Sequence, residues 1–420
     1  MDVWTQYKKY RNDLIYTSDD GKTVKVCVGL SGTFYFWHGE TRETRLAVAR
    51  CFERFEELFG LRLEWVKPNE DISRRAIRID ADNGVPAMRD YIATMDADDQ
   101  LEWEISGGHS VDEASDCYMV ALTIRQWEIK VRSPLSWLSF AIPIETVYGP
   151  RGNPQLFTEF TRFCCEQLRP WHGVAGFASL LPQDRFDSLP AEFDLQQRYY
   201  GLDTVSTGFY LCDHLQRVLK GANWLTMFDK EYPATITREQ WQTLETTPGI
   251  QIWKAGRTYV LQAGDQPTLG PVPDGIPPLY KVVSDIIKPM RLTPMRSFHT
   301  GSMTGEIHFN GRTSELWSQR FDAPGIWPPY PDQIEFHNVD TAIDEYAAQP
   351  LVEPTLQPPA EPPRTTVLRA LPGQPCPQEG DWFSPFIKER VHVKLGDPMP
   401  GPETTEQGAV TWYLRTEQAS

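Results

Sequence analysis

The sequence predicts an α+β protein in which a mixed, mainly antiparallel sheet is covered by helices, with a small C-terminal extension. Segments rich in β-branched and aromatic residues alternate with segments whose apolar residues recur at helical spacing, so strands and helices share a core. A proline-rich stretch then separates the end of the chain from this core. The 420 residues, 40% of them hydrophobic, suffice for one large domain and an extension.

The first elements are a strand over residues 24–37, a helix over 42–59 and a strand over 61–66. The first segment is dominated by β-branched and aromatic residues. The helix carries Phe52 and Phe55 on one apolar face.

A similar order returns as a strand over 135–144, a helix over 154–168 and a strand over 172–180. An internal duplication is one interpretation, although the residue identity between the two stretches is too thin to establish it.

The remaining elements are shorter. Strands are expected over 74–80, 101–106, 117–124 and 127–132, helices over 207–220 and 238–245, a hairpin over 250–264, and a last helix from Pro277 and Pro278 onward. We therefore expect three parts: an α+β domain over 1–295, a proline-rich acidic linker over 296–365 and a small module over 366–420.

Composition limits the environment of the protein. No segment approaches the run of about 18 apolar residues that a membrane span needs, and residues 1–20 lack an apolar signal core. The seven cysteines are odd in number and form no CxxC pair, which favours buried thiols over a disulfide or zinc framework. We expect a cytoplasmic protein.

Negative charge is the most distinctive property of the chain. The formal net charge is −16, which opposes binding to nucleic acid or to an anionic membrane. Residues 90–116, here called the acidic segment, contain no Lys or Arg and carry Asp90, Asp96, Asp98, Asp99, Glu102, Glu104, Asp112, Glu113 and Asp116. We predict that these side chains bind a basic protein partner, with Trp103 as an anchor. A solvated acidic face without a partner is the alternative.

Catalytic motifs are weak. Neither an HExxH pair nor a GxSxG elbow occurs in the sequence, so we predict no metal, no cofactor and no enzymatic activity. A Cys–His pair built from Cys165 or Cys212 with His172 or His214 leaves a hydrolase as an alternative.

The stretch LKGANWLTMF, residues 219–228, shares only Lys220 and Gly221 with a phosphate-binding loop, because further glycines and the following Ser or Thr are missing. We interpret it as scaffold. Gly221 ends the preceding helix, and Trp224 and Leu225 enter the core. Lys220 is then a solvated charge at the helix end.

Four motifs occur in the same order and at similar spacing in one family: LRPWHGVAGFAS (168–179), YYGLDT (199–204), LKGANWLTMF (219–228) and YVLQAGDQPTLG (259–270). On these residues, the stretch 24–295 resembles the type VI immunity family, with a Gly-x-Asn-Trp-Leu-Thr core. The motif residues expected to build the scaffold are Trp171, Gly173, Gly176, Gly221, Asn223, Trp224 and Leu225.

The resemblance implies an antitoxin that binds and occludes a cognate toxin delivered by type VI secretion. Some members look like inhibitors of nuclease effectors, so the implied partner is a protein. The C-terminal module is similar to a segment of other proteins in secreted-toxin systems, which leaves an adaptor of the secretion apparatus as a further alternative.

Overall fold

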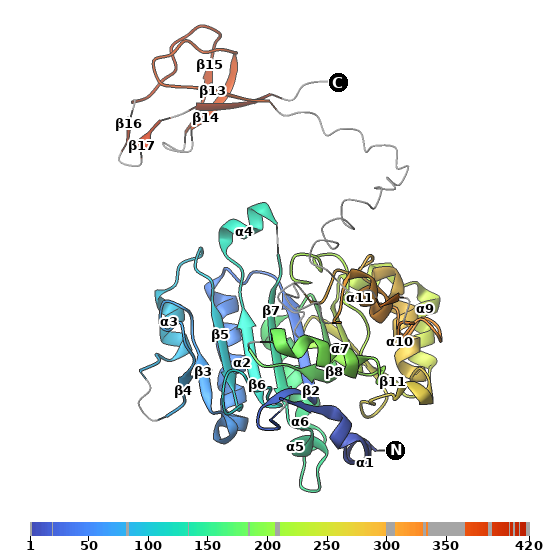
Figure 1. The fold of residues 1–420 in the computed structure, drawn as a ribbon. Helices are drawn as coiled ribbons and strands as arrows, with labels where there is room; N and C mark the ends of the chain where they lie inside the picture. Colours follow the sequence, from blue (N-terminus) through green and yellow to red (C-terminus); the bar gives the residue numbers. More distant parts are fainter. Residues whose placement is uncertain are drawn as a thin grey trace. The chain divides into compact units, whose positions relative to one another are not determined.

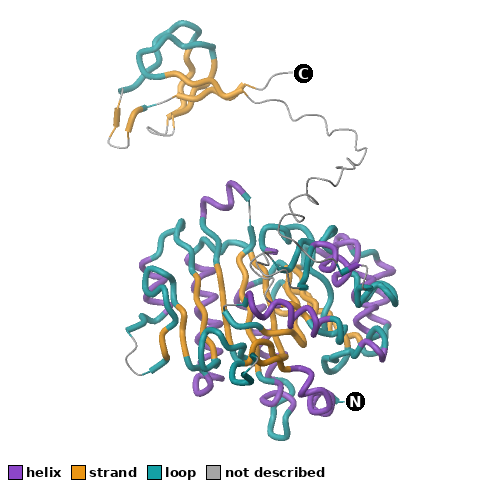
Figure 2. Tube along the Cα trace, in the orientation of Figure 1, coloured by secondary structure: helices purple, strands orange, loops and turns teal. Residues whose placement is uncertain are grey.

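The computed structural model describes residues 2–18, 20–80, 84–132, 134–183, 185–205, 211–299, 307–330, 333–334, 366–384, 389–402, 404–405, 408–410 and 412–416. The chain divides into two units, residues 1–344 and 345–420. Each unit contains its own sheet, and Figure 2 distinguishes the strands, helices and loops of both.

The first unit is built on a 12-stranded sheet (Figure 1). Its order is β11–β12–β10–β8–β2–β7–β6–β5–β3–β4, and the short strands β1 and β9 pair with β2 and β8. The strands are β1 Ile15–Thr17, β2 Val24–Phe36, β3 Trp65–Lys67, β4 Ile77–Arg78, β5 Glu102–Ser106, β6 Tyr118–Leu122, β7 Ser136–Ile142, β8 His172–Leu180, β9 Asp203–Thr204, β10 Leu225–Asp229, β11 Ile250–Ala255 and β12 Thr258–Ala263. Among the described strands of this sheet, only β8 and β9 pair in parallel, so the predicted α+β class with a mainly antiparallel sheet is confirmed.

The long strand β2 lies at the centre of this sheet. It is flanked by β7 and β8, and the register places Phe34 opposite Leu138 and Gly173. Both neighbours run antiparallel to β2, and they are joined through two helices, Ile144–Tyr148 and Leu156–Leu168. Strand β2 is therefore buried along most of its length, in keeping with its almost continuous apolar sequence.

Helices cover the sheet on both sides (Figure 1). Those of the first unit are α1 Val3–Tyr10, α2 Arg42–Phe59, α3 Met88–Thr94, α4 Gln126–Val131, α5 Ile144–Tyr148, α6 Leu156–Leu168, α7 Leu189–Gln196, α9 Arg238–Thr246, α10 Pro278–Ile287 and α11 Gly311–Ser318. In Figure 1, α2 lies behind the sheet and α7 in front of it. Phe55 of α2 packs against Phe160 of α6, with ring centroids 5.7 Å apart. The predicted helices over 42–59 and 154–168 are thus confirmed.

The strand predicted over 127–132 is wrong, because this stretch forms α4. Glu128 explains the difference. One carboxylate oxygen accepts a hydrogen bond from the Arg125 backbone N–H at 2.8 Å, and the other pairs with Arg132 one turn later at 2.7 Å. These contacts stabilise the helix start and its exposed face against the local strand propensity.

The helix predicted over 207–220 does not extend past Leu211 in the described part of that stretch. Residues 206–210 lie outside the described residues, Leu211 is helical, and 212–220 form turns, bends and a bridge. The backbone of Leu219 instead exchanges hydrogen bonds with Met290 and Leu292, at 2.7 and 2.9 Å. Gly221 therefore does not end a helix.

Part of the predicted linker is folded. Residues 307–330 belong to the first unit and include α11, which starts at the capping residue Asn310. Trp317 and Trp327 of this stretch are each 1% exposed. Most of residues 331–365 lie outside the described residues.

The second unit has its own small core. Its strands are β13 Thr366–Ala370, β14 Gly380–Ser384, β15 Glu389–Val393, β16 Thr404–Thr405, β17 Gly408–Ala409 and β18 Trp412–Thr416. Four of them form a sheet in the order β13–β18–β14–β15. Trp382 and Trp412 are fully buried beside Cys376 and Met399. The indole N–H groups of the two tryptophans donate to the backbone carbonyls of Gln378 and Pro400.

Candidate functional site

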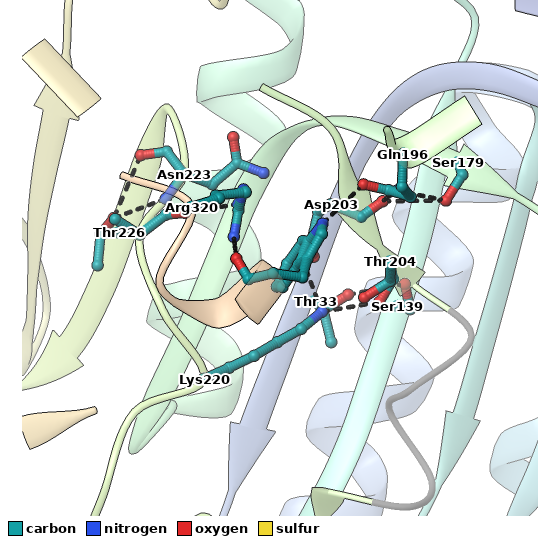
Figure 3. Close-up of polar contacts among 12 residues, drawn as sticks. Thr33, Ser139, Ser179, Gln196, Asp203, Thr204, Lys220, Asn223, Thr226 and Arg320 are labelled. Atoms are coloured by element: carbon teal, nitrogen blue, oxygen red, sulfur yellow. Dashed lines mark hydrogen bonds and ion pairs between the residues drawn. The ribbon is translucent and has the colours of Figure 1, made fainter. Parts of the chain in front are cut away.

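Lys220 lies in the interior and not at the surface. Its ammonium group donates to Asp203 Oδ1 at 2.8 Å and to the Thr204 carbonyl at 2.7 Å, and the side chain is 1% exposed (Figure 3). The prediction of a solvated helix-end charge is wrong, because Lys220 is buried and residues 212–219 directly ahead of it are not helical. The segment that leads into β10 instead places Lys220 in the interior, where its ammonium group pairs with the buried carboxylate of Asp203.

Arg320 is a second buried cation close to this pair. Its guanidinium stacks on the Trp317 ring at 3.6 Å from the centroid and donates to the carbonyls of Tyr200, Trp317 and Ala222 (Figure 3). Desolvation lowers the pKa of Arg320 to about 9, and the charge of Asp203 opposes the shift. Backbone carbonyls and an aromatic face thus replace the water that this cation loses.

A Ser–Glu–His cluster is also buried. Glu192 accepts from Ser179 Oγ at 2.5 Å and lies 2.7 Å from His299 Nε2, and all three side chains are fully buried. A hydrolytic triad needs the serine on the imidazole, whereas here the serine donates to the carboxylate. This cluster fits a packing role.

Of the residues in the Cys–His alternative, Cys165 and His172 each have another partner. Cys165 Sγ lies against Met227 Sδ at 3.4 Å. His172 Nδ1 donates to the Met227 carbonyl at 3.1 Å, and Nε2 accepts from the Lys220 backbone N–H at 2.9 Å, so both ring nitrogens are occupied. Burial lowers the pKa of His172 to about 4, with Lys220 adding to the shift. Cys212 is buried, with 5% of its surface exposed.

Titratable groups do not gather into a metal site either. Within the ranges that the structure describes, no three His, Cys, Asp or Glu side chains are arranged to hold an ion. All seven cysteines are buried, and none forms a disulfide. The interior chemistry is therefore that of a packed core with internally satisfied charges.

The carboxylates of the acidic segment lie in three places: before β5, on β5 and after β5. Asp90 lies on α3, and Asp96, Asp98 and Asp99 lie in the loop before β5; all four are exposed. Glu102 and Glu104 lie on β5 itself and are partly exposed. In the loop after β5, Asp112 is exposed, while Glu113 and Asp116 are partly exposed. Negative charge therefore lies along β5 and at both of its ends.

Arg45 fixes the loop before β5. This residue of α2 is 2% exposed, and its guanidinium donates to the backbone carbonyls of Asp96 and Asp99, both at 2.5 Å. The carboxylates close turns of the same loop: Asp99 accepts from the Asp96 N–H, and Asp96 accepts from the Asp98 N–H, each at 2.8 Å. The loop thus presents its charges on an ordered backbone.

Trp103 is not available as a surface anchor. It is 4% exposed and packs against Tyr91 of α3, with ring centroids 6.1 Å apart. Strand alternation explains this, because Trp103 and Ile105 point toward the helices while Glu102 and Glu104 point to the opposite face.

The motif residues build the scaffold around β8 and β10. Trp224 and Leu225 are buried, and Asn223 Oδ1 accepts from the Trp224 N–H at 2.7 Å. A Cβ at Gly176 would lie 2.4 Å from Asn223 Oδ1, so only glycine leaves room for that side chain. A Cβ at Gly173 would likewise lie 2.8 Å from the Thr33 carbonyl. Of the other two motif positions, Trp171 packs on Tyr232, and Gly221 lies in the irregular segment that leads into β10.

Sequence reasoning missed the residues that lock the interior together: Arg45, Glu192, Asp203, His299 and Arg320. Their partners are distant in sequence, and several of those partners are backbone carbonyls. No local spacing marks such contacts.

The fold and the surface define an α+β protein with a large antiparallel sheet, paired charges inside and an acidic strand region outside. The chain belongs to the TsiV family, described as type VI immunity for VRR-NUC, whose sequence profile matches residues 47–321. A solved structure, the Pseudomonas aeruginosa T6SS protein PA0821, shares the fold with a TM-score of 0.66 and 23% identity, over 83% of this chain and 96% of that chain. No curated protein matches the chain. None of the helices in the described ranges has the length and apolar character that a membrane span requires.

Proposed function

We propose that this protein is an immunity protein that binds a cognate VRR-NUC-type toxin of type VI secretion and occludes it, so that the producing cell survives. Membership of the type VI immunity family over residues 47–321 is the observation that carries the proposal. The protein acts in the cytoplasm as a stoichiometric inhibitor and not as an enzyme.

Electrostatics give this inhibition a physical basis. A nuclease groove holds the phosphate backbone with Lys and Arg, so it attracts carboxylates as well as phosphates. The chain has a formal net charge of −16, and the loop before β5 exposes three aspartates on a backbone fixed by Arg45. Such a surface can cover a cationic groove while the loop loses little conformational entropy on binding.

The buried polar groups support inhibition without catalysis. Lys220 is neutralised by Asp203, and His172 uses both ring nitrogens inside the core. A nucleophile or general base must reach substrate, and these groups are enclosed by packing.

Co-expression with a cognate VRR-NUC-type toxin tests the proposal. The wild-type chain should restore growth and co-purify with the toxin. A chain that neither rescues growth nor binds the toxin is not its immunity protein.

The contribution of the acidic loop needs variants that keep its turns. Asparagine at positions 96, 98 and 99 removes charge but keeps the side-chain oxygens that accept backbone hydrogen bonds. The triple variant Asp96→Asn/Asp98→Asn/Asp99→Asn should bind the toxin more slowly, most clearly at low salt. If it binds at the wild-type rate at low salt, these carboxylates do not steer the toxin.

A further inference from the structure

Side chains of β5 and β6 form a partly exposed strip on one face of the sheet, here called the β5–β6 face. The strand register places Glu102 opposite Leu122 and Glu104 opposite Val120, so these four side chains point to the same side. Lys67 of β3 lies opposite Glu104 on its other flank. All five residues are partly exposed.

The same side of the sheet is buried further along. Across β7 and β2, the row that contains Val120 continues with Ser139 and Thr33, which are 0% and 1% exposed and share a hydrogen bond of 3.1 Å. Figure 3 shows these two beside Thr204 and the end of Lys220. In Figure 1, α7 lies in front of this part of the sheet, whereas no helix of the described ranges lies in front of β5 and β6. The β5–β6 face is thus an open continuation of a buried surface.

The two carboxylates on this face are unpaired. Neither Glu102 nor Glu104 makes a side-chain hydrogen bond or an ion pair with any other described residue. Desolvation raises the pKa of Glu104 to about 7; the charges of Lys67 and Arg185 oppose the shift, and Glu102 adds to it. A carboxylate that has lost part of its water without forming a direct ion pair is unfavourable, and a cation from another molecule in direct contact would relieve this.

Further negative charge flanks the strip at both ends. Asp98 and Asp99 lie in the loop before β5, and Asp112 and Glu113 lie in the loop after it. Trp127 of α4 is 45% exposed beside the first loop, where its backbone N–H donates to Asp98 Oδ1 at 3.2 Å. An exposed tryptophan next to acidic loops suits an anchor at a protein interface.

We infer that the β5–β6 face receives a basic segment of the cognate toxin, whose Lys or Arg pairs with Glu102 and Glu104 while its apolar side chains cover Val120 and Leu122. This inference rests on the proposed function and names the surface that performs it. The charge of the strip selects a cationic protein segment over nucleic acid. The loops at its ends accelerate the encounter, and the strip holds the complex together.

The test compares three pairs of neutral substitutions in the full-length chain. Glu102→Gln/Glu104→Gln removes the charge of the strip, and Asp98→Asn/Asp99→Asn removes charge from the flanking loop. Glu159→Gln/Glu239→Gln removes the same charge from exposed positions on α6 and α9. Association and dissociation rate constants with the cognate toxin are measured for each pair, together with the melting temperature.

The strip variant should raise the dissociation constant about 30-fold or more, mainly through faster dissociation, because it removes partners of a charge pair that becomes buried. The loop variant should mainly slow association, and the α6/α9 variant should bind as the wild type does. The strip variant should keep its melting temperature, since an amide has the shape of the carboxylate and lacks its desolvated charge.

A wild-type dissociation constant for the strip variant would overturn the inference and leave the immunity function standing, since the wild-type chain would still bind the toxin. If the wild-type chain does not bind the toxin, the proposed function fails and this inference fails with it. Leu122→Arg supplies an independent check, because a cation among the carboxylates should repel a basic segment. Toxin binding that survives this change also overturns the inference.

Discussion

Lys220 and Asp203 form an ion pair inside the first unit, with Nζ and Oδ1 2.8 Å apart and side chains 1% and 8% exposed. Burial lowers the pKa of Lys220, and the charge of Asp203 opposes that shift. The pair joins β9, at the edge of β8, to the segment that leads into β10. It therefore couples two parts of the family motifs that are separated in the sequence.

Breaking this pair should destabilise the fold strongly. Lys220→Met should lower the free energy of unfolding by about 3–5 kcal/mol, because Asp203 then stays buried without its cation. The double variant Lys220→Met/Asp203→Leu should lose less than the sum of the two single variants. Chemical denaturation of all four proteins checks this, and a Lys220→Met protein as stable as the wild type would contradict it.

Trp224 should be a major source of core stability. It is 1% exposed, stacks on Phe157 at 5.9 Å and donates from its indole N–H to the Gly264 carbonyl at 2.8 Å. Trp224→Ala should cost about 3–5 kcal/mol through lost packing and a cavity. The matched control is Trp127→Ala, at a position 45% exposed, which should change stability by less than about 0.5 kcal/mol. Similar melting temperatures for the two variants would argue against burial of Trp224.

Gly176 should be intolerant of any side chain. A Cβ there would lie 2.4 Å from Asn223 Oδ1 and 3.2 Å from Trp224 Cβ, so Gly176→Ala should cost about 1–3 kcal/mol by overpacking. Gly60→Ala is the control, since a Cβ at Gly60 meets nothing within 4 Å. Thermal melts of the two variants should separate clearly. Equal stability would mean that the Asn223 side chain does not occupy this space.

His172 should make stability depend on pH between about 4 and 6.5. Burial, reinforced by Lys220, lowers its pKa from the ordinary 6.5 to about 4, and Asp203 opposes the shift. In this window the unfolded chain binds a proton that the folded chain does not, so the free energy of unfolding falls as the pH decreases, by about 3 kcal/mol in total.

Imidazole NMR shifts of the intact protein measure this directly. The His172 signal should remain that of the neutral ring at pH 5.5. His392 of the second unit, whose pKa is raised by its hydrogen bond to Asp381, should already be protonated there. A His172 signal that titrates near pH 6.5 would show that the ring is solvated.

The sequence allowed much of the fold to be predicted where periodicity is long and regular. The helices at 42–59 and 154–168 and the central strand follow from apolar spacing over two or more turns or a continuous buried run. The prediction of a strand at 127–132 was wrong, because the local strand propensity is outweighed by the contacts of Glu128 at the helix start. Helix α11 was missed because proline-rich composition around it suggested a linker.

The candidate site was predictable in its charge but not in its geometry. Composition alone located the carboxylates between residues 90 and 116. The interior position of Trp103 and the outward position of Glu104 depend on which face of β5 meets the helices. The register of β5 with its neighbouring strands determines which face packs against the helices. That register depends on strands that are distant in the sequence.

By itself, the sequence determined the α+β class, the acidic character and the resemblance to the type VI immunity family, because these depend on local periodicity, composition and ordered motifs. Only the tertiary structure decided that Lys220 is buried against Asp203, that Arg45 fixes the acidic loop, and that β5 and β6 present an open face. The physical reason is that burial and pairing of a charge depend on groups brought together across the fold, and a charged side chain carries no local mark of whether it meets water or a partner.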